Sequence, residues 1–401
     1  MSHSPLTGVV AGQFSAGPPQ GKFTPLGLEP AAPSLLEQAR TGDRGEASRE
    51  PRPARPRAVH EVTSVGAISQ RLRRWEDWLA LRQEAALDPD VAIVDPHHHV
   101  WDRGGHTYLP AQFLADAGGG HKLVSTVYVE CQSRYRSTGP EHLRPVGETE
   151  YVVSVLAQSA PASGTRLCAG ILAYADLSLG DAVDEVLDAH ALAAQGRFKG
   201  VRYATAWDAD PAIHRAYPTR AGMLREAPVQ AGARRLAARG LSVDLWLYFH
   251  QLEDAAVLAR ACPDLPIIIN HCGGPLGIGP YAGRRDEVFA RWRAAIQIFQ
   301  TLDNVALKFG GLAMGAAGFA WRAQPVPPAS EELARAWQPY FDVCVDTFGP
   351  RRCMFESNFP VDRTGCTYTS LWNAFKRLVS PLAQSERQAM LSATARRVYG
   401  V

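Results

Sequence analysis

The sequence predicts a closed barrel of eight parallel strands, each followed by a helix, the α/β architecture known as the (β/α)8 or TIM barrel. Two observations carry this prediction: short apolar runs rich in β-branched residues recur from residue 91 onward, and amphipathic stretches separate them. A third is that polar side chains stand where these runs end, which is where barrel enzymes hold their active sites. The 401 residues suffice for such a barrel and an extension before it.

Eight apolar runs are the expected strands. Their apolar residues are almost continuous, as in strands that are covered on both faces. Most connecting segments have apolar side chains at three-and-four spacing, which predicts covering helices, for example 181–195, 223–239, 252–261 and 285–302. The predicted strands are 91–95, 124–130, 167–174, 198–204, 242–248, 266–272, 305–311 and 352–358.

The chain before the barrel falls into two parts. Residues 1–60 are rich in Pro and Gly, lack apolar periodicity and end in an alternation of Arg with Pro, which predicts a disordered extension without a catalytic role. Residues 61–89 contain Ile68 and Leu72 at the start of a helical spacing, and we expect a helix there that packs on the barrel. The barrel domain itself is expected over residues 90–401.

Composition narrows the classes of partner. Lys plus Arg number 42 and Asp plus Glu 40, so the chain has no charge excess with which to hold nucleic acid. No apolar run reaches the roughly 18 residues of a membrane span, and no secretory signal begins the chain. Seven scattered cysteines without a Cys-x-x-Cys pair indicate reduced thiols. We therefore expect a cytoplasmic protein with a small-molecule substrate, and assembly into a homo-oligomer stays open.

The first strand ends in three consecutive histidines. Alternate side chains of an extended strand share a face, so His97 and His99 are expected to point the same way and His98 the other way. Two imidazoles on one face can bind one metal ion such as Zn, Fe, Co or Ni, with further ligands from elsewhere in the barrel. The imidazoles available for this are His271 and His250. The alternative is a pair of hydrogen-bonded histidines.

Charged residues inside predicted strands must point into the barrel and find partners. Three of them, Glu130, Arg202 and Lys308, are the predicted substrate-binding residues. Arg202 can hold a carboxylate with two parallel hydrogen bonds, and Lys308 can stabilise a developing oxyanion. Glu130 can equally be a ligand or a hydrogen-bond anchor for a histidine. The alternative for Lys308 is a structural ion pair with Glu356 on the neighbouring strand.

Three motifs on strands one, six and eight together resemble a known family. They are DPHHHVWD at 95–102, NHCGGP at 270–275 and MFESNFPVD at 354–362. In this order they are similar to the amidohydrolase superfamily, and more narrowly to the amidohydrolase-2 group, which includes sugar lactonases and 2-pyrone-4,6-dicarboxylate lactonase. The resemblance covers roughly residues 90–400.

The resemblance implies a metal site that consists of His97, His99 and His271. One divalent ion is expected there, with zinc as the first expectation. The wider superfamily also has a histidine on strand five, for which His250 is the candidate in this sequence. Members of the lactonase group differ in whether they require a metal, so chemistry without a metal, in which the histidines bind substrate directly, stays open.

Strand eight departs from the superfamily pattern. The superfamily usually has an Asp there that hydrogen-bonds the attacking water or accepts its proton, whereas this chain has Asn358. An amide cannot act as a general base, although it can orient a water or a substrate hydroxyl. The candidate bases in this sequence are then His250, Asp362 and Glu356, in that order.

These features predict a hydrolase that opens a small cyclic ester, a lactone, or acts on a related carbonyl compound. Two alternatives stay open. The same superfamily branch includes metal-dependent decarboxylases of aromatic or muconate-type acids, which release carbon dioxide without consuming water. The second alternative is a barrel that has lost its chemistry through the change at Asn358 and binds a metabolite without turnover.

Overall fold

The structure is a computed structural model that describes residues 74–103, 106–159, 164–213 and 217–401. The expected disordered extension, residues 1–60, lies outside the described residues. The first part of the segment 61–89 does so as well. The predictions for these parts of the chain stay predictions.

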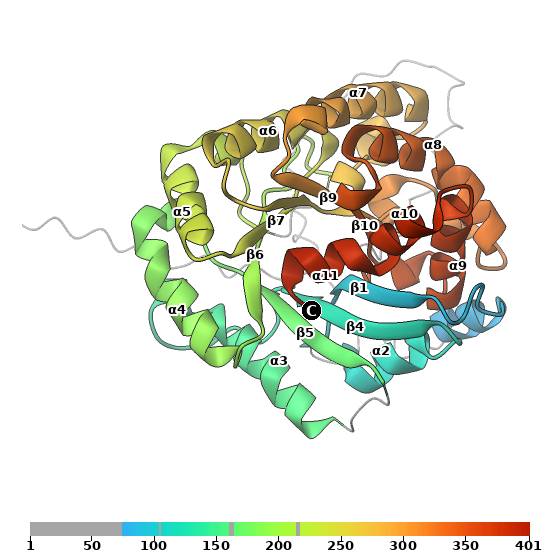
Figure 1. Ribbon diagram of the computed structural model, residues 1–401, viewed down its shortest axis with the longest axis horizontal. Coiled ribbons are helices and arrows are strands. Elements are labelled where there is room, and N and C mark those ends of the chain that lie inside the picture. The colour runs from blue at the N-terminus through green and yellow to red at the C-terminus, as the bar shows by residue number, and fades with distance from the viewer. Residues whose placement is uncertain (1–73, 104–105, 160–163, 214–216) are drawn as a thin grey trace, which may run out of the picture.

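Eight parallel strands form one sheet in which each strand pairs with the next along the chain (Figure 1). The order β1-β4-β5-β6-β7-β8-β9-β10 curls into a nearly closed barrel, which confirms the predicted fold class. The strands are β1 (Ala92–His98), β4 (Lys122–Val129), β5 (Arg166–Ala173), β6 (Phe198–Ala204), β7 (Ser242–Trp246), β8 (Ile267–Ile269), β9 (Val305–Phe309) and β10 (Cys353–Phe355).

The barrel closes between β1 and the segment that follows β10. His98 and Phe359 form an isolated parallel bridge. The amide of Asn358 donates to the carbonyl of His97 at 2.8 Å, and the amide of His99 donates to the carbonyl of Phe359 at 2.8 Å. These hydrogen bonds lie at the C-terminal ends of the strands, so the polar ends of the first and last strands are held side by side.

Two strands end three residues before their predicted ends. The runs 266–272 and 352–358 were predicted as strands, but β8 ends at Ile269 and β10 at Phe355. The backbone explains the difference, because His271 and Asn358 have φ angles of 54° and 53°, in the left-handed region. The chain therefore leaves the extended conformation where its polar side chains begin.

Helices surround the sheet (Figure 1). Phe375 of α9 illustrates how they pack, because its ring stacks on Phe355 of β10 with 4.4 Å between the centroids. Burial of each such side chain contributes about 1.5–3 kcal/mol to the free energy of unfolding. No helix in the described part of the chain is long and apolar enough to cross a membrane. The helices are α2 (Pro110–Ala117), α3 (Val146–Gln158), α4 (Val183–Ala193), α5 (Ala227–Ala238), α6 (Leu252–Ala261), α7 (Arg285–Gln297), α8 (Ser330–Phe348), α9 (Tyr368–Val379), α10 (Gln384–Gln388) and α11 (Thr394–Tyr399).

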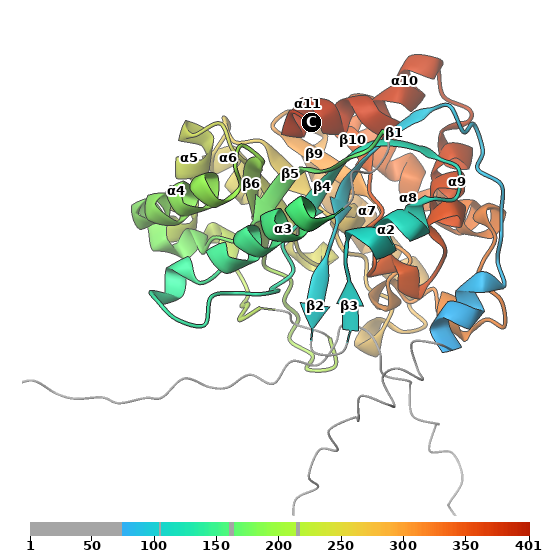
Figure 2. The same cartoon turned by 90° about the horizontal axis from the view of Figure 1, so that it is seen from below.

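The two ends of the barrel differ. Tyr399 of α11 packs into the cluster of apolar side chains that includes Val94, Val127 and Met354 and fills the inside of the barrel. A hairpin of β2 (Trp101–Arg103) and β3 (His106–Tyr108), which the sequence does not predict, lies at the opposite end from α11 (Figure 2). The end with the hairpin is therefore the open mouth at which the strands terminate.

The described part of the segment before the barrel packs against its mouth. Residues 74–80 are helical, with Trp75 and Leu79 buried, and Leu81 just beyond is 60% exposed. The indole Nε1 of Trp78 donates to the carbonyl of Gln324 at 2.9 Å. Since Gln324 follows β9, this helix contacts a loop at the mouth.

Candidate active site

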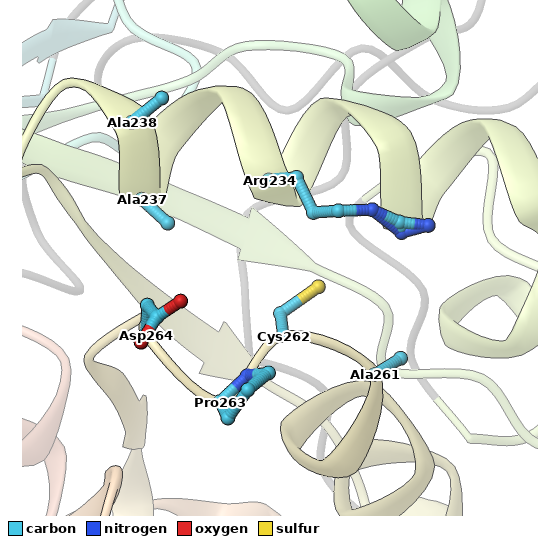
Figure 3. Close-up of a pocket in the computed structure, with 7 residues that line it drawn as sticks. All are labelled: Arg234, Ala237, Ala238, Ala261, Cys262, Pro263 and Asp264. Atoms are coloured by element: carbon cyan, nitrogen blue, oxygen red, sulfur yellow. The ribbon is translucent and has the colours of Figure 1, made fainter.

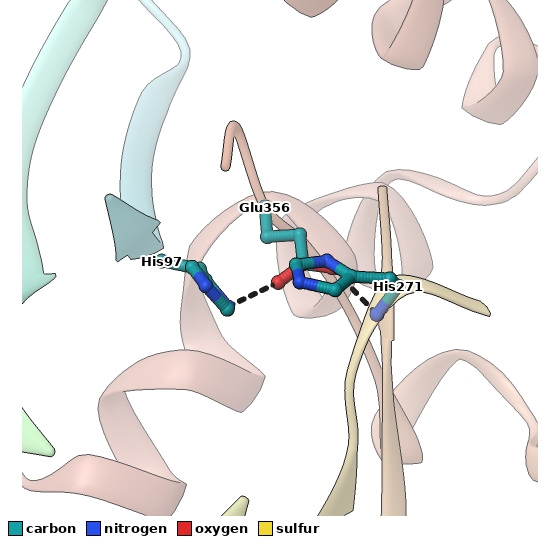
Figure 4. Close-up of side chains that lie close together, drawn as sticks. All are labelled: His97, His271 and Glu356. Atoms are coloured by element: carbon teal, nitrogen blue, oxygen red, sulfur yellow. Dashed lines mark hydrogen bonds and ion pairs between the residues drawn. The ribbon is translucent and has the colours of Figure 1, made fainter. Parts of the chain in front are cut away.

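Three buried side chains from three strands meet at the mouth of the barrel. They are His97 on β1, His271 after β8 and Glu356 directly after β10, and we call them the histidine–glutamate cluster. Nδ1 of His97 lies 2.7 Å from Oε2 of Glu356, and Nδ1 of His271 lies 2.7 Å from Oε1. Figure 4 shows the carboxylate between the two rings. The possible ligand atoms of all three residues lie within 4.8 Å of one another.

Two glycines at the end of β9 make this close packing possible. A Cβ atom on Gly310 would collide with the side chain of Glu356, and one on Gly311 would collide with the ring of His271. Gly311 also has a φ of 70°, which few other residues adopt. The sequence Gly310-Gly311 is therefore required by the neighbouring cluster.

The cluster holds the neutral imidazole of His97 next to an ionised carboxylate. Burial by itself would raise the pKa of Glu356, but the facing His271 and His97 hold it well below its usual range. Burial lowers the pKa of His97 well below its usual range, although Glu356 opposes this. Nδ1 of His271 donates to Glu356, so Nε2 is the ring nitrogen that can face a metal ion or a substrate.

The donor atoms of the cluster fit one divalent ion. Both ring nitrogens of His97 and Oε2 of Glu356 are buried and have no aligned hydrogen-bond partner among the described residues. A buried polar atom without a partner costs about 1–3 kcal/mol, which a bound cation would offset. Two imidazoles and a carboxylate are ligands that Zn²⁺ accepts, at bond lengths of about 2.0–2.2 Å.

His99 lies beside the cluster and is hydrogen-bonded elsewhere. Its ring centroid is 5.0 Å from that of His97. Its Nδ1 is 2.8 Å from the carbonyl of Val129, and its Nε2 is 3.2 Å from Oδ1 of Asn358. Nδ2 of Asn358 in turn is 2.6 Å from Oδ2 of Asp362. Three residues named as candidates from the sequence, His99, Asn358 and Asp362, thus form one continuous line.

The hydrogen-bond acceptors around His99, Asn358 and Asp362 determine which of their atoms carry protons. A carbonyl only accepts, so Nδ1 of His99 carries a proton. Burial, aided by the nearby Arg202, lowers the pKa of His99 well below its usual range, so its Nε2 carries none. Burial raises the pKa of Asp362 to about 8 despite its hydrogen bond with Asn358. Every hydrogen bond is complete when the Asn358 amide is turned to donate to His99 and a protonated Asp362 donates to the amide oxygen.

His98 is separated from these residues, as the alternation along β1 predicts. Its Nε2 lies 2.8 Å from Oγ1 of Thr126, and its ring stacks on Phe113 of α2 with 4.2 Å between the centroids. Burial lowers its pKa to about 3. It is a packed residue behind the mouth.

Arg202 and Glu130, both predicted to bind substrate, contact each other. Nε of Arg202 and the hydroxyl of Tyr217 both hydrogen-bond the carboxylate of Glu130. Nη2 of Arg202 also donates to the carbonyl of Glu130 at 2.9 Å. These contacts neutralise the guanidinium and favour a role in holding the wall of the mouth. Binding of substrate by Arg202 and Glu130 stays a prediction.

Lys308 is fully buried and belongs to a different ion pair from the one suggested by the sequence. Its Nζ lies 2.7 Å from Oδ2 of Asp244 and donates to the carbonyl of Pro96 at 2.8 Å. The pairing of Lys308 with Glu356 was wrong, because Lys308 is in register with Met354 on β10, two residues before Glu356. Binding of substrate oxygens by Lys308 stays a prediction.

Replacing Lys308 with Met is expected to lower the free energy of unfolding by about 3–5 kcal/mol, because the Asp244 carboxylate would stay buried without its cation. Asp244 also accepts hydrogen bonds from the hydroxyl of Tyr399 and from Nδ2 of Asn270. The side-chain oxygen of an Asn at position 244 could keep part of these hydrogen bonds. The double variant Lys308→Met/Asp244→Asn should therefore recover much of the loss in urea denaturation. A single variant with normal stability and no activity would instead support the substrate-binding role.

His250 lies away from the histidine–glutamate cluster, in the turn Phe249–Gln251. Its Nε2 is 2.8 Å from the carbonyl of Trp207, and its ring stacks on Tyr281 with 6.5 Å between the centroids. Within the described residues, the group that could hold a metal contains only His97, His271 and Glu356. A catalytic role for His250 stays a prediction.

An aromatic side chain occupies the end of strand β7 instead. The ring of Trp246 lies 4.6 Å from that of His271, centroid to centroid, at 76°. Trp246 is partly exposed and can offer a face to a ligand. Trp246 was not predicted from the sequence, nor was the contact of Glu356 with both histidines. A signal for Glu356 was present, since it shares a face of the predicted strand 352–358 with Asn358, at the predicted mouth.

A cavity of about 320 Å³ lies elsewhere, between the end of α5 and the turn after α6 (Figure 3). These segments lead into β7 and β8, so the cavity is at the N-terminal end of the barrel. Its lining includes Arg234, Cys262 and Asp264 and no histidine. It is separate from the mouth, where the candidate catalytic residues converge.

The barrel fold and the histidines and carboxylates at its mouth are typical of an enzyme. Comparison with known proteins identifies the family to which the chain belongs. The sequence profile of the amidohydrolase family matches residues 94–401. The chain therefore belongs to the amidohydrolase family, as the three motifs predict.

Individual proteins are similar to this chain over different parts of its length. An uncharacterized protein of Sinorhizobium fredii, y4mH, is 33% identical over 334 residues, which cover 78% of this chain and 99% of that protein. An L-fucono-1,5-lactonase of Burkholderia multivorans is 29% identical over 177 residues, 44% of this chain and 57% of the lactonase. A crystal structure of a Burkholderia multivorans amidohydrolase with bound zinc has a TM-score of 0.60 at 21% identity, over 77% of this chain and 99% of that one. At this identity, the similarity to the crystal structure shows a shared fold and nothing more.

Proposed function

We propose that this protein hydrolyses a small lactone. The observation that carries the proposal is the histidine–glutamate cluster, in which His97, His271 and Glu356 meet at the mouth of the barrel. Its buried ligand atoms include both ring nitrogens of His97 and Oε2 of Glu356, which have no aligned hydrogen-bond partner among the described residues. Relatives named L-fucono-1,5-lactonase and L-rhamnono-gamma-lactonase support the choice of a cyclic ester.

We also propose one divalent ion, zinc, as the cofactor. His97, His271 and Glu356 would hold it, and a bound divalent ion polarises a carbonyl oxygen and lowers the pKa of a water. Glu356 orients the ring of His271 through two contacts to one oxygen: Nδ1 at 2.7 Å and the backbone amide at 2.8 Å. Such a carboxylate partner fixes which ring nitrogen faces a ligand.

Asp362 is the proposed proton-transferring residue. Burial raises its pKa to about 8, so near neutral pH it can both give and take a proton. Its carboxyl also accepts from the amide of Ala313 at 2.7 Å, which fixes its position beside Asn358. Hydrolysis of a lactone moves one proton from the attacking water to the leaving alkoxide, so an ionised Asp362 would take that proton and, once protonated, give it to the alkoxide. We therefore propose Asp362 ahead of His250 as the base, although the sequence favoured His250 first.

The test is a panel of sugar and simple lactones, with acid release followed by a pH indicator. The protein is assayed as isolated, after chelation and after zinc is added back. Turnover of a lactone that falls on chelation and returns with zinc is the expected result. Open-chain methyl esters of the same acids are the matched controls, and their turnover should be lower.

The same samples distinguish the alternatives. Aromatic and muconate-type acids are included, and release of carbon dioxide without acid production would identify a decarboxylase. Tight binding of a lactone without turnover would identify a metabolite-binding barrel. Equal lactone turnover before and after complete removal of metal would overturn the zinc proposal and leave direct binding by the histidines.

We further propose the cytoplasm as the location of the protein. All seven cysteines are buried and free, which suits a reducing compartment. Separation of cells into cytoplasmic and other fractions, followed by detection of the protein, tests this.

A further inference from the structure

Arg363 follows Asp362 directly and points the other way. Asp362 is fully buried, whereas Arg363 reaches outward to two carboxylates on other segments. Nη1 of Arg363 donates to Oε1 of Glu76 at 2.7 Å. Its Nε lies 2.7 Å from Oδ2 of Asp116, on α2. Arg363 therefore joins the loop after β10 to two elements that are distant in the sequence.

The helix at residues 74–80 holds Arg363 through a second residue as well. The guanidinium carbon of Arg363 lies 5.2 Å from the centre of the Trp75 ring. Nε1 of Trp75 donates to the carbonyl of Arg363 at 3.2 Å. Both the backbone and the side chain of Arg363 are thus bound to the segment before the barrel, and we call Trp75, Glu76 and Asp116 the brace.

The inner side of the same loop ends at the candidate active site. The backbone amide of Asp362 donates to the carbonyl of Asn358 at 3.1 Å, and its carboxyl contacts Nδ2 of Asn358 at 2.6 Å. Asn358 contacts His99. Only one peptide bond separates the outer anchor, Arg363, from Asp362.

We propose that Arg363, held by the brace, is a positioning residue that fixes Asp362 against Asn358 in the catalytic mouth. This inference rests on the proposed lactone hydrolysis for its kinetic test, but its structural test is independent of any activity. Residues 74–80, which precede the barrel, then help to position a side chain of the site.

A second set of contacts anchors the same N-terminal segment farther along and provides a control. Glu84 accepts from the amide of Ser330 at 2.8 Å, from the hydroxyl of Ser370 at 3.0 Å and from Nδ2 of Asn373 at 3.0 Å. None of these contacts involves the loop that carries Asp362. Loss of this anchor should loosen the chain around residue 84 and leave the contacts of Arg363 with Trp75 and Glu76 in place.

The experiment compares Arg363→Ala, Arg363→Lys and the control Glu84→Gln in the full chain. Thermal midpoints, kcat and KM on the best lactone, and hydrogen–deuterium exchange of the amides at 358–366 are measured. We expect Arg363→Ala to lower kcat at least about tenfold with KM changed less than about threefold. We expect Arg363→Lys, which keeps the charge, to recover most of kcat.

Two comparisons decide the matter. Glu84→Gln should keep kcat within about twofold of the parent and leave exchange at 358–366 unchanged, even when its thermal midpoint falls as far as that of Arg363→Ala. Equal loss of kcat in both variants, or unchanged kcat in Arg363→Ala, would show a merely structural role. If the parent hydrolyses no lactone, the proposed function fails, and exchange at 358–366 alone supports or overturns the brace.

A gentler variant covers failure of Arg363→Ala to fold. Glu76→Gln/Asp116→Asn removes both partner charges with almost no change in volume. We expect it to lower kcat at least about threefold and to increase exchange at 358–366. If kcat and the exchange at 358–366 both equal those of the parent protein, the proposal is overturned.

Discussion

Replacing Glu356 with Gln is expected to lower lactone turnover at least about a hundredfold, which corresponds to about 2.7 kcal/mol of transition-state stabilisation. One carboxylate contacts Nδ1 of both His97 and His271 at 2.7 Å, so the substitution removes the charge that both imidazoles face. An amide nitrogen pointed at one protonated Nδ1 would also repel it. Turnover and bound zinc after dialysis, measured on the same preparation, check the prediction.

Glu148→Gln is the matched control for a buried carboxylate. Glu148 is also fully buried, and burial raises its pKa to about 7 with a contribution from Glu130. It accepts from the hydroxyl of Tyr128 at 2.8 Å and lies outside the cluster. We expect Glu148→Gln to keep turnover within about threefold of the parent. Normal turnover and zinc content in Glu356→Gln would show that the histidine–glutamate cluster is not the site.

The fold could be predicted because its signal is local. A strand such as β9 is an unbroken apolar run around one Lys, and a helix such as α9 repeats apolar residues at three-and-four spacing. What could not be predicted depends on single backbone angles. Cys272, with a φ of 53°, and Asn358 leave the extended conformation without any Gly or Pro at those positions. The β2–β3 hairpin was missed because strands of three residues carry no alternation to detect.

The site could be predicted in part for a similar reason. The position of His97 follows from the end of strand one, and its nearness to His271 from the meeting of strand ends in a barrel. The partner of a buried charge depends on its depth in the barrel, which the register between strands sets. Lys308 pairs with Asp244, two strands away along the barrel, and not with Glu356. A sequence without its register cannot distinguish these partners.

Asn358→Asp is expected to lower turnover at least about tenfold, a loss of about 1.4 kcal/mol of transition-state stabilisation. The volume hardly changes, so the fold should survive. The amide, however, joins His99 at 3.2 Å to Asp362 at 2.6 Å, and a carboxylate has no N–H to donate to the unprotonated Nε2 of His99. It would place two acidic groups within hydrogen-bond distance in a fully buried position, where they must share one proton.

The pH dependence of this variant gives the sharper test. In the parent, burial raises the pKa of Asp362 to about 8, so the loop keeps one proton at neutral pH. In Asn358→Asp one proton can stay between the two carboxyl groups at low pH and preserve the contact, but at higher pH two negative charges would repel each other. The ratio of variant to parent turnover should therefore fall as pH rises from about 6 to about 9. Variant turnover equal to or above that of the parent across this range would falsify a positive role for Asn358, because the usual strand-eight Asp would then serve at least as well as the amide.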